Sequence, residues 1–196
     1  MTKHRHFIIH KPYGYLSQFV HNERRRRNRK LLGELHDFPE GTMSIGRLDQ
    51  DSEGLLLLTT DGKVSHQVLS KKVEKEYYIQ VDGIITDKAI EELKKGVDIA
   101  LQGETYETLP CKAFRLDSEP GFPPRTQKIR DARHGPTSWM AVTVNEGKFR
   151  QVRKMSAAVG FPTLRLVRVR IGNIHLNDMK SGDVVEVEGF GLSEDL

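Results

Sequence analysis

Apolar residues recur along this chain with two different periods, one typical of strands and one typical of helices. Leu55 to Leu58 form a short continuous apolar run between turn residues, which predicts a buried strand. Residues 75–81 alternate instead, with Tyr77, Ile79 and Val81 on one face, as in a half-buried strand. The same criteria predict further strands at 6–10, 97–99, 111–116, 139–144, 164–171 and 182–187.

Helical spacing is confined to short segments at 31–35, at 62–70, after Thr86 and from Phe149 onward. Thr86 is a suitable N-cap, and Gly96 a suitable residue to end the helix that follows. Residues 120–136 contain four prolines and several basic residues, which predicts a long irregular loop. Short helices and more numerous strands favour an α+β fold with a mainly antiparallel mixed sheet, short flanking helices and long loops around a central cleft.

Length and composition limit the class of protein. A chain of 196 residues with 37% hydrophobic and 30% charged residues can bury a core, and it is neither a membrane protein nor wholly disordered. The first residues lack the apolar core of a signal peptide, so we expect a cytoplasmic protein. We expect one domain over 1–196, with two possible subdomains that share the cleft, 1–60 with 140–196 and 61–139.

The distribution of charge says more than the net charge of +4. Basic residues cluster at 24–30, 125–133, 148–154 and 165–170. Any one cluster is most simply a solvated face, but four of them favour a groove for RNA or DNA. Arg24, Arg25 and Arg26 belong to the most basic of these clusters, and we predict that they bind RNA.

Residues that bind metals or carry redox chemistry are poorly represented. Cys111 is the single cysteine, so the chain cannot form an internal disulfide. The eight histidines show no paired ligand spacing, and no phosphate-binding glycine loop is present. We therefore expect neither a metal nor a cofactor.

The stretch 44–62 concentrates the candidate chemistry. Asp49, Asp51 and Glu53 lie just before the leucine run, in a loop that also holds Arg47. A carboxylate can act as nucleophile or base without a metal, but a lone aspartate in a turn is usually a cap or a surface charge. The pattern alone does not rank the three carboxylates.

The segment Gly46-Arg47-Leu48-Asp49, followed by residues 51–56, resembles the signature of RNA pseudouridine synthases. The likeness is to one branch of that family, which contains type A, specific for small-subunit RNA, and types B, E and F, specific for large-subunit RNA. Other segments match the family's motifs in the expected order, namely Lys11-Pro12, Lys75-x-Tyr77, residues 146–155 and residues 160–166. Residues 136–139, and the expected lack of an N-terminal RNA-binding domain before Lys11, narrow the likeness to one large-subunit type within the branch.

The resemblance implies a cytoplasmic, monomeric enzyme with a single catalytic domain that isomerises a specific uridine to pseudouridine in large-subunit (23S) ribosomal RNA. Asp49 would be the essential carboxylate, Arg153 its ion-pair partner, and Tyr77 the residue that packs against the uracil ring. Whether Asp49 attacks C1′, adds to C6 or removes a proton from C2′ stays open. The predicted RNA ligands are Arg47, Lys11, Arg150, Gln151 and Arg165, beside the arginines at 24–26.

Alternatives remain at this stage. Arg150 competes with Arg153 as the partner of Asp49. A non-catalytic RNA-binding or ribosome-assembly protein with the same fold is the main alternative function. A glycoside hydrolase that uses two carboxylates is a third, but it leaves the basic clusters unexplained.

Overall fold

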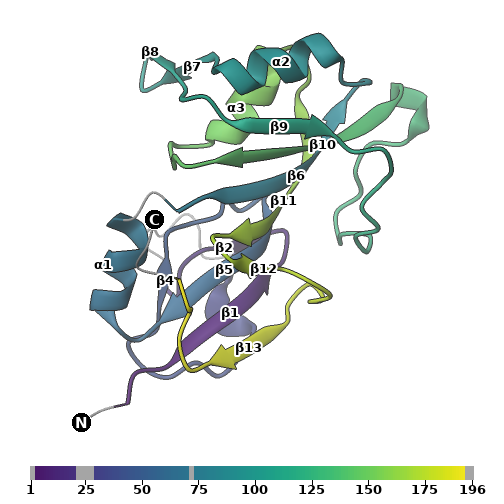
Figure 1. Cartoon of the computed structure of the whole chain (residues 1–196). Coiled ribbons are helices and arrows are strands. Elements are labelled where there is room, and N and C mark those ends of the chain that lie inside the picture. The colour runs from purple at the N-terminus through teal and green to yellow at the C-terminus, as the bar shows by residue number, and fades with distance from the viewer. Residues whose placement is uncertain (1–2, 21–28, 71–72, 193–196) are drawn as a thin grey trace. The chain divides into compact units, whose positions relative to one another are not determined.

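The computed structural model describes residues 3–20, 29–70 and 73–192, and the chain divides into two compact units (Figure 1). Unit 1 comprises Met1–Val73 with Arg168–Leu196, and unit 2 comprises Glu74–Val167. These bounds differ from those of the predicted subdomains. That the chain is a single catalytic domain remains a prediction.

Unit 1 is built mainly on antiparallel strands. Its strands are β1 (His6–Lys11), β2 (Tyr15–Leu16), β3 (Lys30–Leu31), β4 (Met43–Ile45), β5 (Glu53–Thr59), β12 (Ile174–His175) and β13 (Val184–Val187), and its helices are the 3-10 helix η2 (Leu32–Glu34) and α1 (Gly62–Ser70). β1 lies between β13 and β5 and is antiparallel to both. β4 pairs with β5, α1 packs against both, and the short strands β2 and β3 pair in parallel.

β5 is the centre of the core of unit 1. All seven of its residues are buried, as the run of leucines predicts. On β1, Phe7 lies opposite Leu58 and Ile9 opposite Leu56, and none of these four side chains is exposed. A strand buried along its whole length holds the loop that precedes it in a fixed position, and that loop carries Asp49.

Unit 2 combines a three-stranded antiparallel set with two α-helices, a 3-10 helix and a hairpin. Its strands are β6 (Lys75–Asp82), β7 (Asp98–Leu101), β8 (Glu104–Glu107), β9 (Lys112–Arg115) and β10 (Thr137–Val144), and its helices are α2 (Asp87–Lys95), η3 (Ala132–His134) and α3 (Gln151–Ala158). β10 lies between β6 and β9, and β7 pairs with β8. β11 (Thr163–Ile171) begins in unit 2 and ends in unit 1. The prediction of a mainly antiparallel α+β fold is confirmed.

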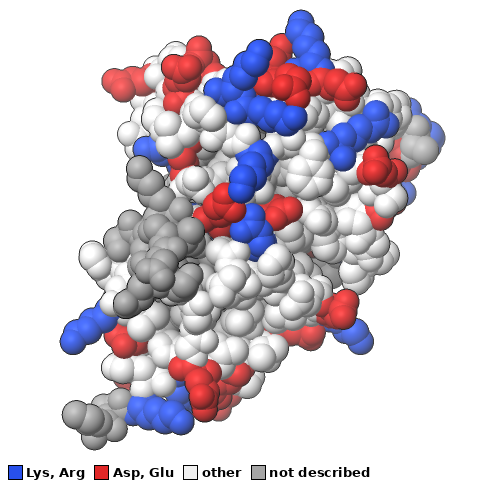
Figure 2. Space-filling view, in the orientation of Figure 1, with Lys and Arg blue, Asp and Glu red and all other residues white. Residues whose placement is uncertain are grey.

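The outer face of α2 carries charges of both signs. Figure 2 shows blue and red side chains intermingled over this end of unit 2. Lys94 pairs with Glu91 at 2.6 Å, and Lys88 with Glu92 at 3.9 Å. The face of α2 that carries these pairs is thus not a purely basic surface.

The predicted N-cap of α2 is confirmed, because Thr86 Oγ1 accepts from the Ala89 N–H at 3.2 Å.

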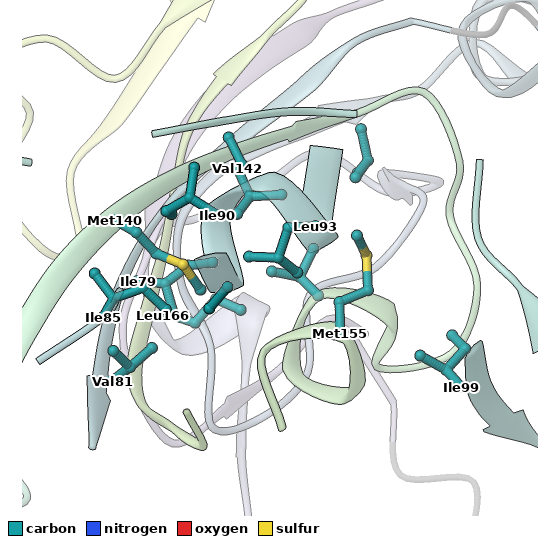
Figure 3. Close-up of a cluster of buried hydrophobic side chains, with 14 residues drawn as sticks. Ile79, Val81, Ile85, Ile90, Leu93, Ile99, Met140, Val142, Met155 and Leu166 are labelled. Atoms are coloured by element: carbon teal, nitrogen blue, oxygen red, sulfur yellow. The ribbon is translucent and has the colours of Figure 1, made fainter. Parts of the chain in front are cut away.

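The apolar core of unit 2 joins its strands to both helices (Figure 3). Ile79 and Val81 of β6 pack with Leu93 of α2 and Met155 of α3, and all four are buried. Tyr77 packs against the same cluster, so the predicted face of β6 is confirmed. In the described part of the chain no helix is long and apolar enough to cross a membrane.

Candidate active site

Asp49 lies in the loop between β4 and β5, and the segment 14–17 holds its neighbours by reciprocal hydrogen bonds. Ser17 Oγ donates to Leu48 O at 2.7 Å and accepts from the Leu48 N–H at 3.0 Å. The Gly14 N–H donates to Gln50 O at 2.8 Å, and Gln50 Nε2 donates to Gly14 O at 3.1 Å. The chain is therefore fixed on both sides of a half-buried Asp49.

The same loop closes on itself before β5 begins. The Ser52 N–H donates to the Asp49 carbonyl at 3.0 Å, and Ser52 and Glu53 are buried. Sequence patterns missed Ser17 and Gln50 as positioning residues because their partners are backbone atoms of a distant segment. Arg47, on the other side of Leu48, is exposed, while Leu48 itself is buried. Leu48, Ser52 and Glu53 are thus buried, whereas Arg47 is exposed and Asp49 is half-buried.

Lys11 is the buried cation beside this loop. Its side chain is fully buried, and Nζ donates to Tyr15 O at 2.8 Å and to Pro12 O at 3.0 Å. Burial lowers the pKa of Lys11 to about 7, although the carboxylates of Glu53, Asp51 and Asp49 act in the opposite direction. The amine and the acidic loop of unit 1 are thus close enough to interact electrostatically.

The pKa of Lys11 predicts a pH-dependent stability. Between about pH 7 and pH 10.5 the unfolded chain binds a proton at this lysine that the folded chain does not, so stability rises with pH in that window. We expect the free energy of unfolding to gain about 1 kcal/mol per pH unit from this group. Lys11→Met should remove that slope in denaturant unfolding between pH 7.5 and 9.5.

Lys63→Met is the matched control, because Lys63 lies exposed on α1 of the same unit. It should leave the slope unchanged. An unchanged slope in Lys11→Met as well would contradict a neutral Lys11 in the folded protein. The comparison uses slopes because Lys11→Met also leaves two carbonyls without their donor and lowers stability at every pH.

In unit 2, the turn before α3 is held by Glu146. Its carboxylate accepts from the hydroxyl of Tyr106, from the Leu109 N–H at 2.9 Å and from Gln151 Nε2 at 2.8 Å. Burial by itself raises the pKa of Glu146, but these three hydrogen bonds together lower it below its usual value. Glu146 is therefore held as a carboxylate that fixes the start of α3.

α3 begins at Gln151, slightly later than the apolar spacing predicted. The cause is Arg150, which has a φ of 52° and so lies in the left-handed region, outside the helix. A non-glycine residue in this region is uncommon, and such residues gather at functional sites. Arg150 and Arg153 are both half-buried. Burial therefore does not decide which of the two arginines is the partner of Asp49.

The three predicted catalytic residues belong to different parts of the chain. Asp49 is in unit 1, whereas Tyr77 on β6 and Arg153 on α3 are in unit 2. Within unit 2, Tyr77 packs against the core to which α3 contributes Val152. The ion pair of Asp49 with Arg153, and the packing of Tyr77 on a uracil ring, stay predictions.

The predicted RNA ligands divide by exposure. Arg47 is exposed, but Lys11, Gln151 and Arg165 are buried, at 0%, 4% and 6% relative exposure. Arg165 Nη2 donates to Pro123 O at 3.0 Å, and its guanidinium lies over the ring of Phe122. Direct RNA contacts by these three buried residues stay predictions. The arginines at 24–26 lie outside the described residues.

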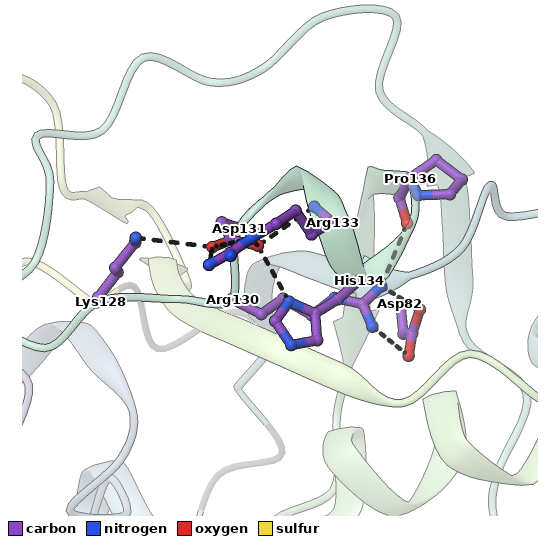
Figure 4. A network of polar contacts seen from close by, with 7 residues as sticks. All are labelled: Asp82, Lys128, Arg130, Asp131, Arg133, His134 and Pro136. Atoms are coloured by element: carbon purple, nitrogen blue, oxygen red, sulfur yellow. Dashed lines mark hydrogen bonds and ion pairs between the residues drawn. The ribbon is translucent and has the colours of Figure 1, made fainter.

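Part of the basic cluster at 125–133 is occupied within the protein (Figure 4). The guanidinium of Arg130 forms two hydrogen bonds with the carboxylate of Asp82 and one with Pro136 O at 3.3 Å. Asp131 accepts from Arg133 at 2.7 Å and lies 3.1 Å from His134 Nδ1. These pairs hold the irregular loop between β9 and β10 and reduce the positive charge that it offers.

Among residues 3–20, 29–70 and 73–192, no group of three or more His, Cys, Asp or Glu side chains is arranged to hold a metal ion. Burial raises the pKa of Cys111 to about 11, which makes its thiol a poor nucleophile.

Residues 5–158 match the family model described as RNA pseudouridylate synthase, and this range includes the Asp49 loop, Tyr77 and Arg153. The chain belongs to the RNA pseudouridylate synthase family. The family predicted from the motifs is thus confirmed, with the pseudouridine synthase fold and the enzyme class that it implied.

Individual relatives agree with the pseudouridylate synthase family assignment. The chain is 39% identical over 183 residues to a Vibrio parahaemolyticus protein named ribosomal large subunit pseudouridine synthase E, a match that covers 92% of this chain and 73% of the relative. A Xanthomonas axonopodis pv. citri protein of the same name is 40% identical over 172 residues, or 87% of each chain. This is the large-subunit type to which residues 136–139 pointed.

Solved structures extend the comparison to the fold. A crystal structure described as pseudouridylate synthase superposes with a TM-score of 0.74 at 26% identity, over 95% of this chain and 71% of that one. A chain of a Cbf5-Nop10-Gar1 complex shares the fold at a TM-score of 0.53 and 16% identity, over 89% of this chain and 50% of that one. This chain thus shares its fold with both solved structures.

Proposed function

We propose that this chain isomerises a specific uridine of large-subunit ribosomal RNA to pseudouridine, with Asp49 as the essential carboxylate. The observation that carries the proposal is the Asp49 loop, anchored on both sides by Ser17 and Gly14, in a chain whose residues 5–158 match the family. The names of the relatives support large-subunit ribosomal RNA as the substrate.

The reaction breaks the bond between N1 of the base and C1′ of the ribose, turns the base, and joins C5 to C1′. N1 gains a proton and C5 loses one, so the product is an isomer and no co-reactant is consumed. Asp49 serves as the nucleophile or base in this scheme, because a carboxylate needs no metal for either role.

Two residues of unit 2 complete the proposed catalytic set. Arg153 pairs with Asp49 and orients its carboxylate, since a guanidinium matches the geometry of a carboxylate. Tyr77 packs against the uracil ring and takes part in proton transfer at C5. Both residues lie on elements that pack on one core, β6 and α3, which gives them a rigid support.

RNA binding rests on the exposed Arg47, on the half-buried Arg150 and on the arginines at 24–26. Arg47, next to Leu48 in the anchored loop, is a ligand for phosphate or for the flipped nucleotide, and Arg150 lies at the start of α3. The arginines at 24–26 add affinity for the phosphate backbone. A ribosomal RNA substrate implies a cytoplasmic protein, and we propose that it acts as a monomer without a membrane partner.

Mapping pseudouridine in large-subunit ribosomal RNA tests the function directly. RNA from cells that lack the gene should miss pseudouridine at one site that wild-type cells modify. Restoring the gene should restore that site. If the two maps are identical, the chain is better described as a non-catalytic RNA-binding or ribosome-assembly protein with the same fold.

A further inference from the structure

Phe149 is the most exposed large apolar side chain in the described part of the chain, at 71% relative exposure. It lies in the turn between β10 and α3, within unit 2. Bases of single-stranded RNA stack on aromatic side chains, so an exposed ring on a loop of an RNA-modifying enzyme has the surface that such a contact needs. The charge pattern of the sequence marks the basic residues around Phe149 but gives no role to the ring.

One cation lies over this ring, and two others are its neighbours in the sequence. Lys154 Nζ lies 5.3 Å from the centroid of the Phe149 ring and donates to Ala100 O at 2.6 Å. Lys148, which precedes Phe149, has its Nζ 4.8 Å from the centroid of the Tyr106 ring, and Arg150 follows directly. The segment 147–154 contains no acidic residue. An aromatic ring among positive charges is suited to a ligand with a flat apolar part and a negative part.

The turn that carries Phe149 is clamped on both sides. The Gln151 N–H donates to Lys148 O at 3.1 Å, and the Lys148 N–H donates to Gln151 Oε1 at 3.1 Å. Gln151 is in turn bonded to Glu146, which also accepts from Tyr106 and from the Leu109 N–H. These bonds fix the backbone that carries the ring, so the turn itself loses little conformational freedom when a ligand binds.

We propose that Phe149 is a stacking platform for an unpaired base of the RNA substrate, and that Lys148, Arg150 and Lys154 bind the phosphates next to that base. The proposal rests on the proposed function for the kind of ligand. A nucleotide has the flat π surface and the negative charge that the site complements, whereas an apolar protein surface has no use for the three cations.

Phe149→Ala should weaken binding of deproteinised large-subunit ribosomal RNA by at least about fivefold, because a base stacked on an aromatic ring contributes about 1–3 kcal/mol. The loss should appear in KM more than in kcat. Phe149→Trp should retain binding, since it keeps the stacking surface, and Phe149→Leu should behave like Phe149→Ala. Circular dichroism checks that each variant is folded.

Phe114→Ala is the matched control. Phe114 lies on β9 of the same unit and is 48% exposed, but it lies outside the basic segment 147–154. It should bind RNA like the wild type. Equal losses in both variants, or wild-type affinity in Phe149→Ala, would overturn the proposal.

A fluorescence titration tests the contact without relying on catalysis. The native chain has one tryptophan, Trp139, which is 6% exposed and so is shielded from a ligand. The additional indole of Phe149→Trp should be quenched by a single-stranded oligouridylate, with little change in the wild-type protein. Absence of quenching at saturating RNA would reject stacking at this position.

These measurements separate the stacking platform from the proposed function. Wild-type protein that isomerises no uridine in ribosomal RNA would refute the function, whatever Phe149 does. Wild-type protein that is active while Phe149→Ala matches it in KM and affinity would refute the platform alone. Loss of binding to an apolar partner protein, with RNA affinity intact, would instead identify the ring as a protein contact.

Discussion

Replacing Asp49 with asparagine should abolish isomerisation, with turnover reduced by at least about a thousandfold, and leave RNA affinity nearly unchanged. Asparagine keeps the size of the side chain but cannot act as a base or as an anionic nucleophile. The bonds that position the loop, from Ser17 to Leu48 and from Gly14 to Gln50, do not use the carboxylate and should persist. Release of tritium from uridine labelled at C5 measures the turnover.

Asp51→Asn is the matched control for that experiment. Asp51 lies in the same loop and also acts on the buried Lys11, yet the resemblance gives it no catalytic role. It should retain most of the activity. If Asp49→Asn turns over within tenfold of the wild type, the assignment of the essential carboxylate is wrong. If Asp51→Asn is equally inactive, the loop depends on its total charge and not on one group.

The elements that a hydrophobic pattern specifies were predicted well. The run of leucines at 55–58 predicted the buried strand β5, and the spacing of Val152 and Met155 predicted α3. Such patterns predict these elements because each element forms by burying apolar side chains on one face or on both faces. The start of α3 was placed too early because the left-handed conformation of Arg150 leaves no trace in the spacing of apolar residues.

Elements held by their partners were missed. The strand β8, at 104–107, has exposed residues at three of its four positions, so no alternation marks it. It forms because β7 provides a register, in which Ile99 faces Tyr106. The short strands β2, β3 and β12 are likewise too brief to carry a pattern. Their existence depends on neighbours that a linear pattern does not contain.

The candidate site shows the same division between residue type and environment. Motif order predicts Asp49, Tyr77 and Arg153 as the catalytic residues, and these roles stay predictions. The resemblance implied RNA contacts for Lys11 and Arg165, and the structure buries both side chains. A motif specifies residue types and does not report exposure. Conversely, Ser17 binds the backbone of Leu48 and Glu146 binds the side-chain amide of Gln151. No sequence pattern predicts these two contacts.

Gly54→Ala should lower the free energy of unfolding by at least about 4 kcal/mol and so rank among the most destabilising single changes. Gly54 has a φ of 106°, a conformation that side chains disfavour, and an added Cβ would lie 2.3 Å from Arg168 O and 2.7 Å from Arg168 N. Both are backbone atoms of β11 in unit 1, so no side chain can move aside to make room.

Gly62→Ala is the matched control, because a Cβ at Gly62, the first residue of α1, meets no atom within 4 Å. Alanine there should be neutral or slightly stabilising, since it favours helix more than glycine does. Denaturant unfolding of both variants measures the difference. A loss below about 1 kcal/mol in Gly54→Ala would mean that β5 and β11 can separate at this point. In that case the close backbone contact is not what fixes the strand behind the Asp49 loop.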